Sequence, residues 1–232
     1  MRGYWDSRAR ENAVWYVDTT CDYRQPDMDA FFRTGPLVVS EALLDAPVQP
    51  RDRGTAVEIG PGLGRICRAL ADHFDRVVGV DISEEMVTRA RELVPDPRIS
   101  FVVGNGLDLQ PVETGSADFV LTFTVLQHLS SADLIESYLR ESARVLKPGG
   151  VLAAQWNGTA RPTLWRARVA WWSARNAIGG PLATDIRSRP EFAGTRMPFE
   201  RVRAVLESSG MTVRSTKGLG TLFSWVWAEK LP

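Results

Sequence analysis

Three glycines stand one residue apart directly after a short apolar run. The stretch VEIGPGLG, residues 57–64, contains Gly60, Gly62 and Gly64, and the acid Glu58 precedes the first of them by two positions. Ordering glycine costs more backbone entropy than ordering any other residue, so three together suggest that something approaches the main chain closely. Asp81 ends the next apolar run, where its carboxylate could accept hydrogen bonds from both hydroxyls of a ribose. The pattern predicts a site for a nucleoside-bearing ligand rather than a tight turn that binds nothing.

The elements that position these residues alternate between strands and helices. Short apolar runs predict strands at 55–60, 76–81, 98–103, 117–123 and 151–156, and helices are predicted at 62–74, 84–93 and 131–146. Because the strands are apolar almost throughout, both faces of the sheet should be covered, as in a doubly wound, mostly parallel α/β sheet. Ligands of such sheets bind beyond the carboxyl ends of the strands, where the glycines and Asp81 fall.

Two predicted helices carry capping signals at their first residues. Ser83 precedes two acids, and Ser130 and Asp133 form a pair like a capping box. Pro148-Gly149-Gly150 is expected to end the second of these helices.

The chain on either side of this alternation differs from it. Residues 1–50 predict an N-terminal helical cap, broken or kinked at Gly35–Pro36, with 47–54 as a linker to the domain formed by residues 51–232. Four aromatic residues of the cap could cover a bound ligand: Tyr4, Trp5, Trp15 and Tyr16.

Residues 157–196 interrupt the alternation and form a helical insert after the fifth strand, predicted as a substrate lid. The alternative to a lid is a pair of surface helices whose tryptophans pack into the core. The alternative to a binding role for the arginines of the insert is that they form a solvated face. A helix over 197–210 follows, and then two strands too close together for a helical crossover, which should pair as a hairpin.

The overall composition gives no argument for a charged macromolecular partner. The 28 basic residues balance the 28 acidic ones, so net charge favours neither nucleic acid nor a membrane surface. The two cysteines are far apart and no CxxC pair exists, so we expect no zinc site and a reduced, cytoplasmic protein. The N-terminus lacks the apolar core of a signal peptide, and no apolar run is long enough to span a membrane.

Five stretches follow one another along the chain: VEIGPGLG (57–64), VVGVDIS (77–83), GNG (104–106), ADFVLTFTVLQHL (117–129) and RVLKPGG (144–150). On these stretches the chain resembles, from about residue 50 to its end, the class I S-adenosylmethionine-dependent methyltransferases. Each stretch is modest alone, but their order and spacing together are specific. The resemblance implies a Rossmann-like sheet of seven strands, in which the last strand is inserted antiparallel.

The resemblance also implies a set of cofactor-binding residues. Gly60 and Gly62 would approach the methionine part and the ribose, and Asp81 would bind the ribose hydroxyls. Asn105 stands where the family more often has Asp, and its amide oxygen can still accept a hydrogen bond from the adenine amino group. The full implied set is Glu58, Gly60, Gly62, Gly64, Asp81, Ile82, Asn105, Gly106, Thr122, Phe123 and Gln127. Ile82 and Gly106 belong to its adenine side, and Thr122 and Phe123 to its methionine side.

Methyl transfer from a sulfonium requires alignment above all, which can contribute ~7–11 kcal/mol. An alcohol acceptor must also lose a proton, and His128 follows the fourth strand on the crevice side, so we consider it as a general base. The alternative is that His128 orders the loop or contacts the cofactor. His73 ends the first predicted helix of the sheet domain, on the side away from the crevice, and is interpreted as structural.

The resulting hypothesis is a methyltransferase that acts on a small molecule, most readily at a hydroxyl oxygen. TFTV stands where amino-methylating nucleic-acid enzymes carry [DN]PP[FY], and no Pro-Cys nucleophile is present. Residues 122–127 lack the acids that a metal-dependent O-methyltransferase would need, so we expect no metal. The arginine excess of the insert suggests an acidic acceptor. The alternatives are a nucleic-acid or protein methyltransferase that uses this insert, and a cofactor-binding protein without methyl transfer.

Overall fold

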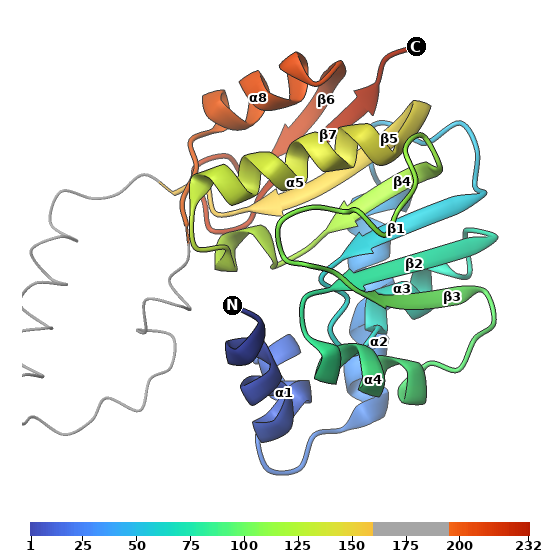
Figure 1. The fold of residues 1–232 in the computed structure, drawn as a ribbon, viewed down its shortest axis with the longest axis vertical. Coiled ribbons are helices and arrows are strands. Elements are labelled where there is room, and N and C mark those ends of the chain that lie inside the picture. Colours follow the sequence, from blue (N-terminus) through green and yellow to red (C-terminus); the bar gives the residue numbers. More distant parts are fainter. Residues whose placement is uncertain (160–194) are drawn as a thin grey trace, which may run out of the picture.

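Seven strands form one sheet in the order β3-β2-β1-β4-β5-β7-β6 (Figure 1). The structure is a computed structural model that describes residues 1–159 and 195–232. The strands are β1 (Thr55–Ile59), β2 (Arg76–Asp81), β3 (Ile99–Val103), β4 (Ala117–Thr122), β5 (Leu146–Trp156), β6 (Met211–Lys217) and β7 (Ser224–Lys230). The pairs among β1 to β5 are parallel, and β7 runs antiparallel to both β5 and β6. This confirms the predicted doubly wound sheet with an antiparallel last strand.

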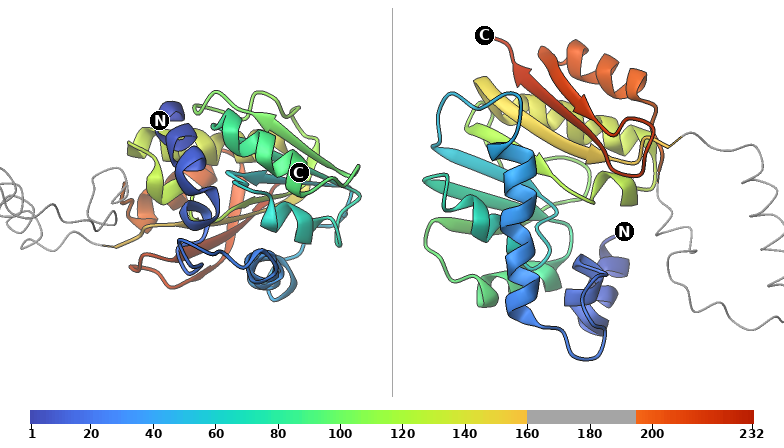
Figure 2. Two further views of the ribbon diagram at one scale, coloured as in Figure 1. Left: turned by 90° about the horizontal axis from the view of Figure 1, so that it is seen from below. Right: turned by 180° about the vertical axis from the view of Figure 1, so that it is seen from behind.

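Helices cover both faces of the sheet, which explains why the strands are so apolar. On one face, α5 (Ala132–Val145) and α8 (Phe199–Ser208) contribute to one core. On the other face, the core includes residues of α2 (Met28–Val39), α3 (Arg65–Leu70) and α4 (Glu84–Leu93). The two further views show α2 crossing the back of the sheet (Figure 2). Between these layers, β4 is buried at every position.

The predicted helix starts are confirmed in one case and corrected in the other. Ser83 caps α4, because its hydroxyl accepts a hydrogen bond from the Met86 amide at 3.2 Å. The cap of α5 is Ser131 rather than Ser130: the Ser131 backbone is extended, and its hydroxyl accepts from Leu134 N at 3.3 Å. Pro148-Gly149-Gly150 do not end this helix: α5 stops at Val145, and all three residues lie within β5, which begins at Leu146 rather than at the predicted residue 151.

The expected break at Gly35–Pro36 is wrong. The helix α2 continues through Pro36 to Val39 and is followed by a π-helical turn, η1 (Ser40–Leu44). Gly35 lies against the backbone of Arg65, where a Cβ atom would not fit, so glycine serves helix packing here. The carbonyl of Ala42 in η1 accepts a hydrogen bond from the indole of Trp227 at 2.9 Å. This part of the predicted cap therefore packs into the main core.

The first helix, α1 (Arg2–Val17), lies apart from both layers, beside the carboxyl ends of the parallel strands (Figures 1 and 2). Two of its alanines pack with Phe31, Leu63 and Met86. Its Asp6 carboxylate accepts a hydrogen bond from the Ser83 hydroxyl at 2.6 Å. The helix is thus attached at the cap of α4.

The predicted lid, residues 157–196, falls largely outside the described residues and stays a prediction. Among the helices that the structure describes, none is long and apolar enough to cross a membrane.

Candidate functional site

The glycine turn follows β1 and leads into α3. Gly60, Gly62 and Gly64 have φ angles of 70°, 53° and 82°, in the left-handed region that glycine adopts without strain. A Cβ atom on Gly62 would lie 2.6 Å from Cγ2 of Val17, and one on Gly60 would collide with Val125. The turn therefore needs glycine both for its backbone path and for close packing.

Asp81 ends β2 beside this turn. Its carboxylate accepts hydrogen bonds from the Gly62 amide at 3.1 Å and from the Ser83 amide at 2.9 Å. Burial raises the pKa of Asp81, and these backbone hydrogen bonds act in the opposite direction. Each oxygen still has a lone pair that could accept from a ligand hydroxyl. The predicted ribose-binding residue is thus fixed in place by the glycine turn itself.

Glu58 lies behind the turn and does not line the cavity described below. The residue is 2% exposed, and burial raises the pKa of its carboxyl to about 7, with a hydrogen bond to Cys67 opposing the shift. Gly64 and Thr122 also stay outside the cavity lining. Any effect of these three residues on a ligand would pass through the shape of the turn and of the strand end.

Ile82 and Gly106 lie against each other on the predicted adenine side. A Cβ atom on Gly106 would collide with the Ile82 side chain, and both residues line the cavity. Asn105 is exposed and does not line it. The Asn105 amide donates to Asp108 at 2.8 Å and accepts from the Leu107 amide at 2.7 Å. Its predicted contact with adenine would require this side chain to turn.

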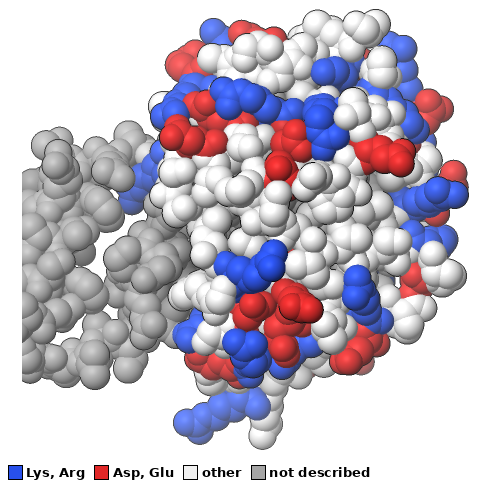
Figure 3. Space-filling view, viewed as in Figure 1, with Lys and Arg blue, Asp and Glu red and all other residues white. Residues whose placement is uncertain are grey.

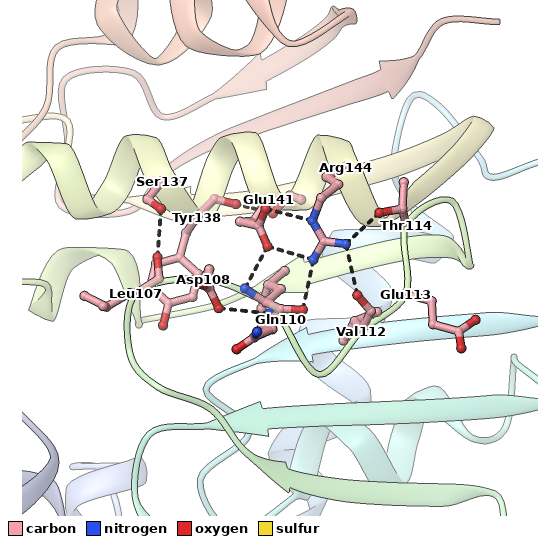
Figure 4. A network of polar contacts seen from close by, with 12 residues as sticks. Leu107, Asp108, Gln110, Val112, Glu113, Thr114, Ser137, Tyr138, Glu141 and Arg144 are labelled. Atoms are coloured by element: carbon pink, nitrogen blue, oxygen red, sulfur yellow. Dashed lines mark hydrogen bonds and ion pairs between the residues drawn. The ribbon is translucent and has the colours of Figure 1, made fainter.

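A polar network on α5 holds the loop that follows Gly106 (Figure 4). The Glu141 carboxylate accepts from the Leu109 amide at 3.0 Å, and the Arg144 guanidinium donates to the Leu109 carbonyl at 3.0 Å. Arg144 also donates to the Val112 carbonyl at 3.1 Å and pairs with Glu141 at 2.7 Å. The RVLKPGG stretch thus contributes to the site indirectly, by fixing the adenine-side loop.

The loop after β4 brings the remaining predicted residues to the same place. Phe123, Gln127 and His128 line the cavity, the last two from the short 3-10 turn η2 (Leu126–His128). The ring of Trp5 from α1 meets the His128 ring edge-on, with centroids 5.6 Å apart. Burial lowers the pKa of His128 to about 4, so its ring is neutral near pH 7.

One cavity of about 880 Å³ joins these parts, a volume typical of small-molecule sites. Of the predicted site residues, eight line it: Gly60, Gly62, Asp81, Ile82, Gly106, Phe123, Gln127 and His128. Of the four aromatic residues predicted to cover it, Trp5 and Tyr16 line it, whereas Tyr4 and Trp15 do not. No sequence pattern singles out Asp18 and Thr34, which also line the cavity. Arg65 could have been noticed, because it directly follows the third glycine.

Residues 57–154 match the family model of a methyltransferase domain. Residues 57–154 therefore form a methyltransferase domain. The match begins at the strand before the glycine turn and ends in β5, so it includes the Asp81 and His128 sides of the cavity.

Curated proteins also resemble the chain. A 2-methyl-6-phytyl-1,4-hydroquinone methyltransferase of Synechocystis is 36% identical over 106 residues, which cover 44% of this chain and 32% of that protein. A methyltransferase-like protein of Schizosaccharomyces pombe is 27% identical over 177 residues, or 76% of this chain and 66% of that protein. The chain spans only 26% to 32% of the length of the first three curated relatives that it matches.

Solved structures share the fold of this methyltransferase domain. Magnesium protoporphyrin IX methyltransferase from Synechocystis, solved with bound S-adenosylhomocysteine, superposes with a TM-score of 0.64 at 16% identity, covering 99% of this chain and 97% of that one. A Haloferax volcanii chain in complex with a methyltransferase activator superposes with a TM-score of 0.62 at 21% identity, covering 95% of this chain and 97% of that one.

The residues that line the cavity fit S-adenosylmethionine, the cofactor that the resemblance implies, by their chemistry. Asp81 offers a carboxylate to two hydroxyls, Ile82 offers an apolar face to a base, and the glycine turn leaves the main chain accessible. Within residues 1–159 and 195–232, no group of three or more His, Cys, Asp or Glu side chains could hold a metal ion.

Proposed function

We propose that this protein transfers a methyl group from S-adenosylmethionine to a hydroxyl oxygen of a small molecule. The observation that carries the proposal is one cavity whose lining includes Gly62, Asp81 and Ile82 together with Gln127 and His128 from the turn after β4. A cofactor seated on the first group would leave room for an acceptor beside the second.

The walls of the cavity suggest an acceptor with an apolar body. Leu37 of α2 is 70% exposed and Phe223 is 50% exposed, and both line the cavity together with Leu222. Large apolar side chains left in water favour an apolar ligand. Arg196, from the predicted lid, also lines the cavity and adds a positive charge, which suits an acidic group on the acceptor.

The distribution of surface charge also favours a small acceptor over a nucleic acid. On the face shown in Figure 3, basic and acidic side chains are interspersed over the described residues. Nucleic-acid-binding surfaces typically carry a basic stripe instead.

When bound, the cofactor supplies a methyl group on a positively charged sulfur, which is open to in-line displacement. The residues of the chain align the acceptor and exclude water. His128 has a pKa of about 4, so its neutral ring can accept a hydrogen bond from the acceptor hydroxyl. It is too weak a base to ionise an alcohol in advance. It can still take the proton as the forming bond makes the oxygen acidic.

The proposal is tested by calorimetric titration with S-adenosylhomocysteine, followed by an acceptor screen in which mass spectrometry detects the transferred methyl group. Asp81→Asn should weaken binding of S-adenosylhomocysteine, and the exposed Asp133→Asn should leave it unchanged. If the folded wild-type protein does not bind S-adenosylhomocysteine, the proposed function is refuted. If it binds but no acceptor is methylated, a cofactor-binding protein without methyl transfer becomes the better account.

His128→Ala should lower turnover by ~10²- to 10⁴-fold while the affinity for S-adenosylhomocysteine stays the same. Because the ring stays neutral above its pKa of about 4, the wild-type rate should not fall between pH 8 and pH 6 on account of this group. Unchanged turnover in the variant would show that alignment alone carries the reaction.

A further inference from the structure

Three polar side chains from separate elements meet at the cavity in a place that the family motifs do not assign. They are Asp18, directly after α1, Thr34 in α2, and Arg65, the first residue of α3. A guanidinium nitrogen of Arg65 lies 3.5 Å from the Asp18 carboxylate, and the same nitrogen donates a hydrogen bond to the Thr34 hydroxyl.

Arg65 is an unusual residue to bury for packing alone. Its side chain is 6% exposed, and burial lowers its pKa, which the carboxylates of Asp18 and Glu58 counteract. Its Nε atom is buried and has no hydrogen-bond partner among the described residues. Removing a charged pair from water costs more than the pairing returns unless further hydrogen bonds complete it. The Nε–H group of Arg65 is therefore a hydrogen-bond donor that no described residue of the folded chain uses.

One part of S-adenosylmethionine carries charges for which the predicted site residues offer no charged partner. The charges of Arg65 and Asp18 match this part. Asp81 suits the ribose, and Ile82 with Gly106 suits the base. The remaining end of S-adenosylmethionine is an amino acid with one ammonium and one carboxylate. A planar guanidinium recognises a carboxylate through paired hydrogen bonds, and a carboxylate recognises an ammonium.

We propose that Arg65 and Asp18 form the binding site for the amino-acid end of the cofactor, with Arg65 holding its carboxylate and Asp18 its ammonium. The Thr34 hydroxyl holds the guanidinium in position. This inference rests on the proposed function, since it concerns the same cofactor.

The assignment makes the N-terminal segment part of the cofactor site. Val17 packs onto Gly62 of the glycine turn, and the next residue, Asp18, reaches Arg65 at the start of α3. Residues far outside the matched domain would thus complete the site that this domain begins.

The test compares two probes by calorimetry: S-adenosylhomocysteine and 5′-methylthioadenosine, which has the same nucleoside and a thioether but no amino-acid end. Arg65→Gln and Asp18→Asn should each weaken S-adenosylhomocysteine binding by ~10- to 100-fold, since each removes a charge-assisted hydrogen bond. Binding of 5′-methylthioadenosine should change less than ~2-fold. Asp81→Asn should weaken both probes, because both carry the ribose.

Arg68→Gln is the matched control, because Arg68 belongs to the same helix but is exposed. It should leave both affinities unchanged. Thermal unfolding of each variant checks its fold, and if Arg65→Gln does not fold, Asp18→Asn alone decides the comparison.

The outcomes separate this inference from the proposed function. If the folded wild-type protein binds neither probe, the proposed function is refuted and the inference with it. If the wild-type protein binds both probes and the Arg65 and Asp18 variants lose affinity for both equally, or for neither, the cofactor assignment stands and the amino-acid site is overturned.

Discussion

The buried acid Glu58 should make the stability of this protein fall as the pH rises. Its carboxyl is 2% exposed, and burial raises its pKa from 4.5 to about 7. Because one pKa unit corresponds to ~1.36 kcal/mol, the proton that Glu58 holds in the folded state contributes about 3 kcal/mol. This contribution is fully present below pH 4.5 and is lost as the pH rises through about 7, because the folded state then has to bury a charge.

The assay is urea unfolding of the wild-type protein and of Glu58→Gln at pH 5 and at pH 8. Glutamine keeps the size of the side chain and removes its titration, whereas Asp81 and Cys67, whose pKa values are also raised by burial, remain in both proteins. The free energy of unfolding should fall between the two pH values by ~2–3 kcal/mol more in the wild type than in the variant. The intrinsic cost of the substitution cancels in this difference. Parallel pH dependences for the two proteins would refute the reasoning.

Two further predictions each have a matched control in the chain. Asp118 is 3% exposed and accepts hydrogen bonds from Lys147 at 2.8 Å and from a backbone amide of β1, so Asp118→Ala should lower the free energy of unfolding by ~2–4 kcal/mol. The control is Asp133→Ala: this side chain is 89% exposed in its ion pair, so its removal should lower the free energy of unfolding by less than ~0.5 kcal/mol. Similar losses for the two variants in urea unfolding would contradict the prediction. Gly62→Ala should weaken S-adenosylhomocysteine binding in calorimetry by ~10-fold or more, because its φ of 53° and its packed neighbour both oppose a side chain. Gly115→Ala, with φ of 64° but open space around it, should cost ~1 kcal/mol of stability and leave that affinity unchanged; a matching loss of affinity there would show that backbone strain alone explains both variants.

The sequence predicted the sheet well, because its strands are buried on both faces and their apolar runs carry the whole signal. The strand β2 has its predicted range, and so does the helix α4. The start of α4 could be predicted because the Ser83 cap marks it. The prediction that failed concerns a feature set by contacts between residues far apart in the sequence. The helix α2 passes through Pro36 because Gly35 lets it approach α3, and no local pattern records that contact.

In the candidate site, too, the residues set by local pattern were predicted and those set by distant contacts were not. Motif positions located Gly62 and Asp81, whose places at the cavity follow from backbone geometry at the ends of two strands. The motif also located Asn105, but it could not give the direction of the side chain, which is set by hydrogen bonds to its own turn. Asp18 carries no pattern of its own, because its place at the cavity depends on how α1 docks.

That docking links the N-terminal segment to the cofactor side through three separate contacts. Asp6 bonds to the Ser83 cap of α4, Val17 covers Gly62, and Asp18 pairs with Arg65. Each contact falls on or next to a motif that the family resemblance had already assigned to the cofactor. A ligand bound between α1 and the strand ends would stabilise the docked segment, because binding to one arrangement shifts the equilibrium toward it. Under the proposed function, residues 1–18 therefore form one wall of the cofactor site.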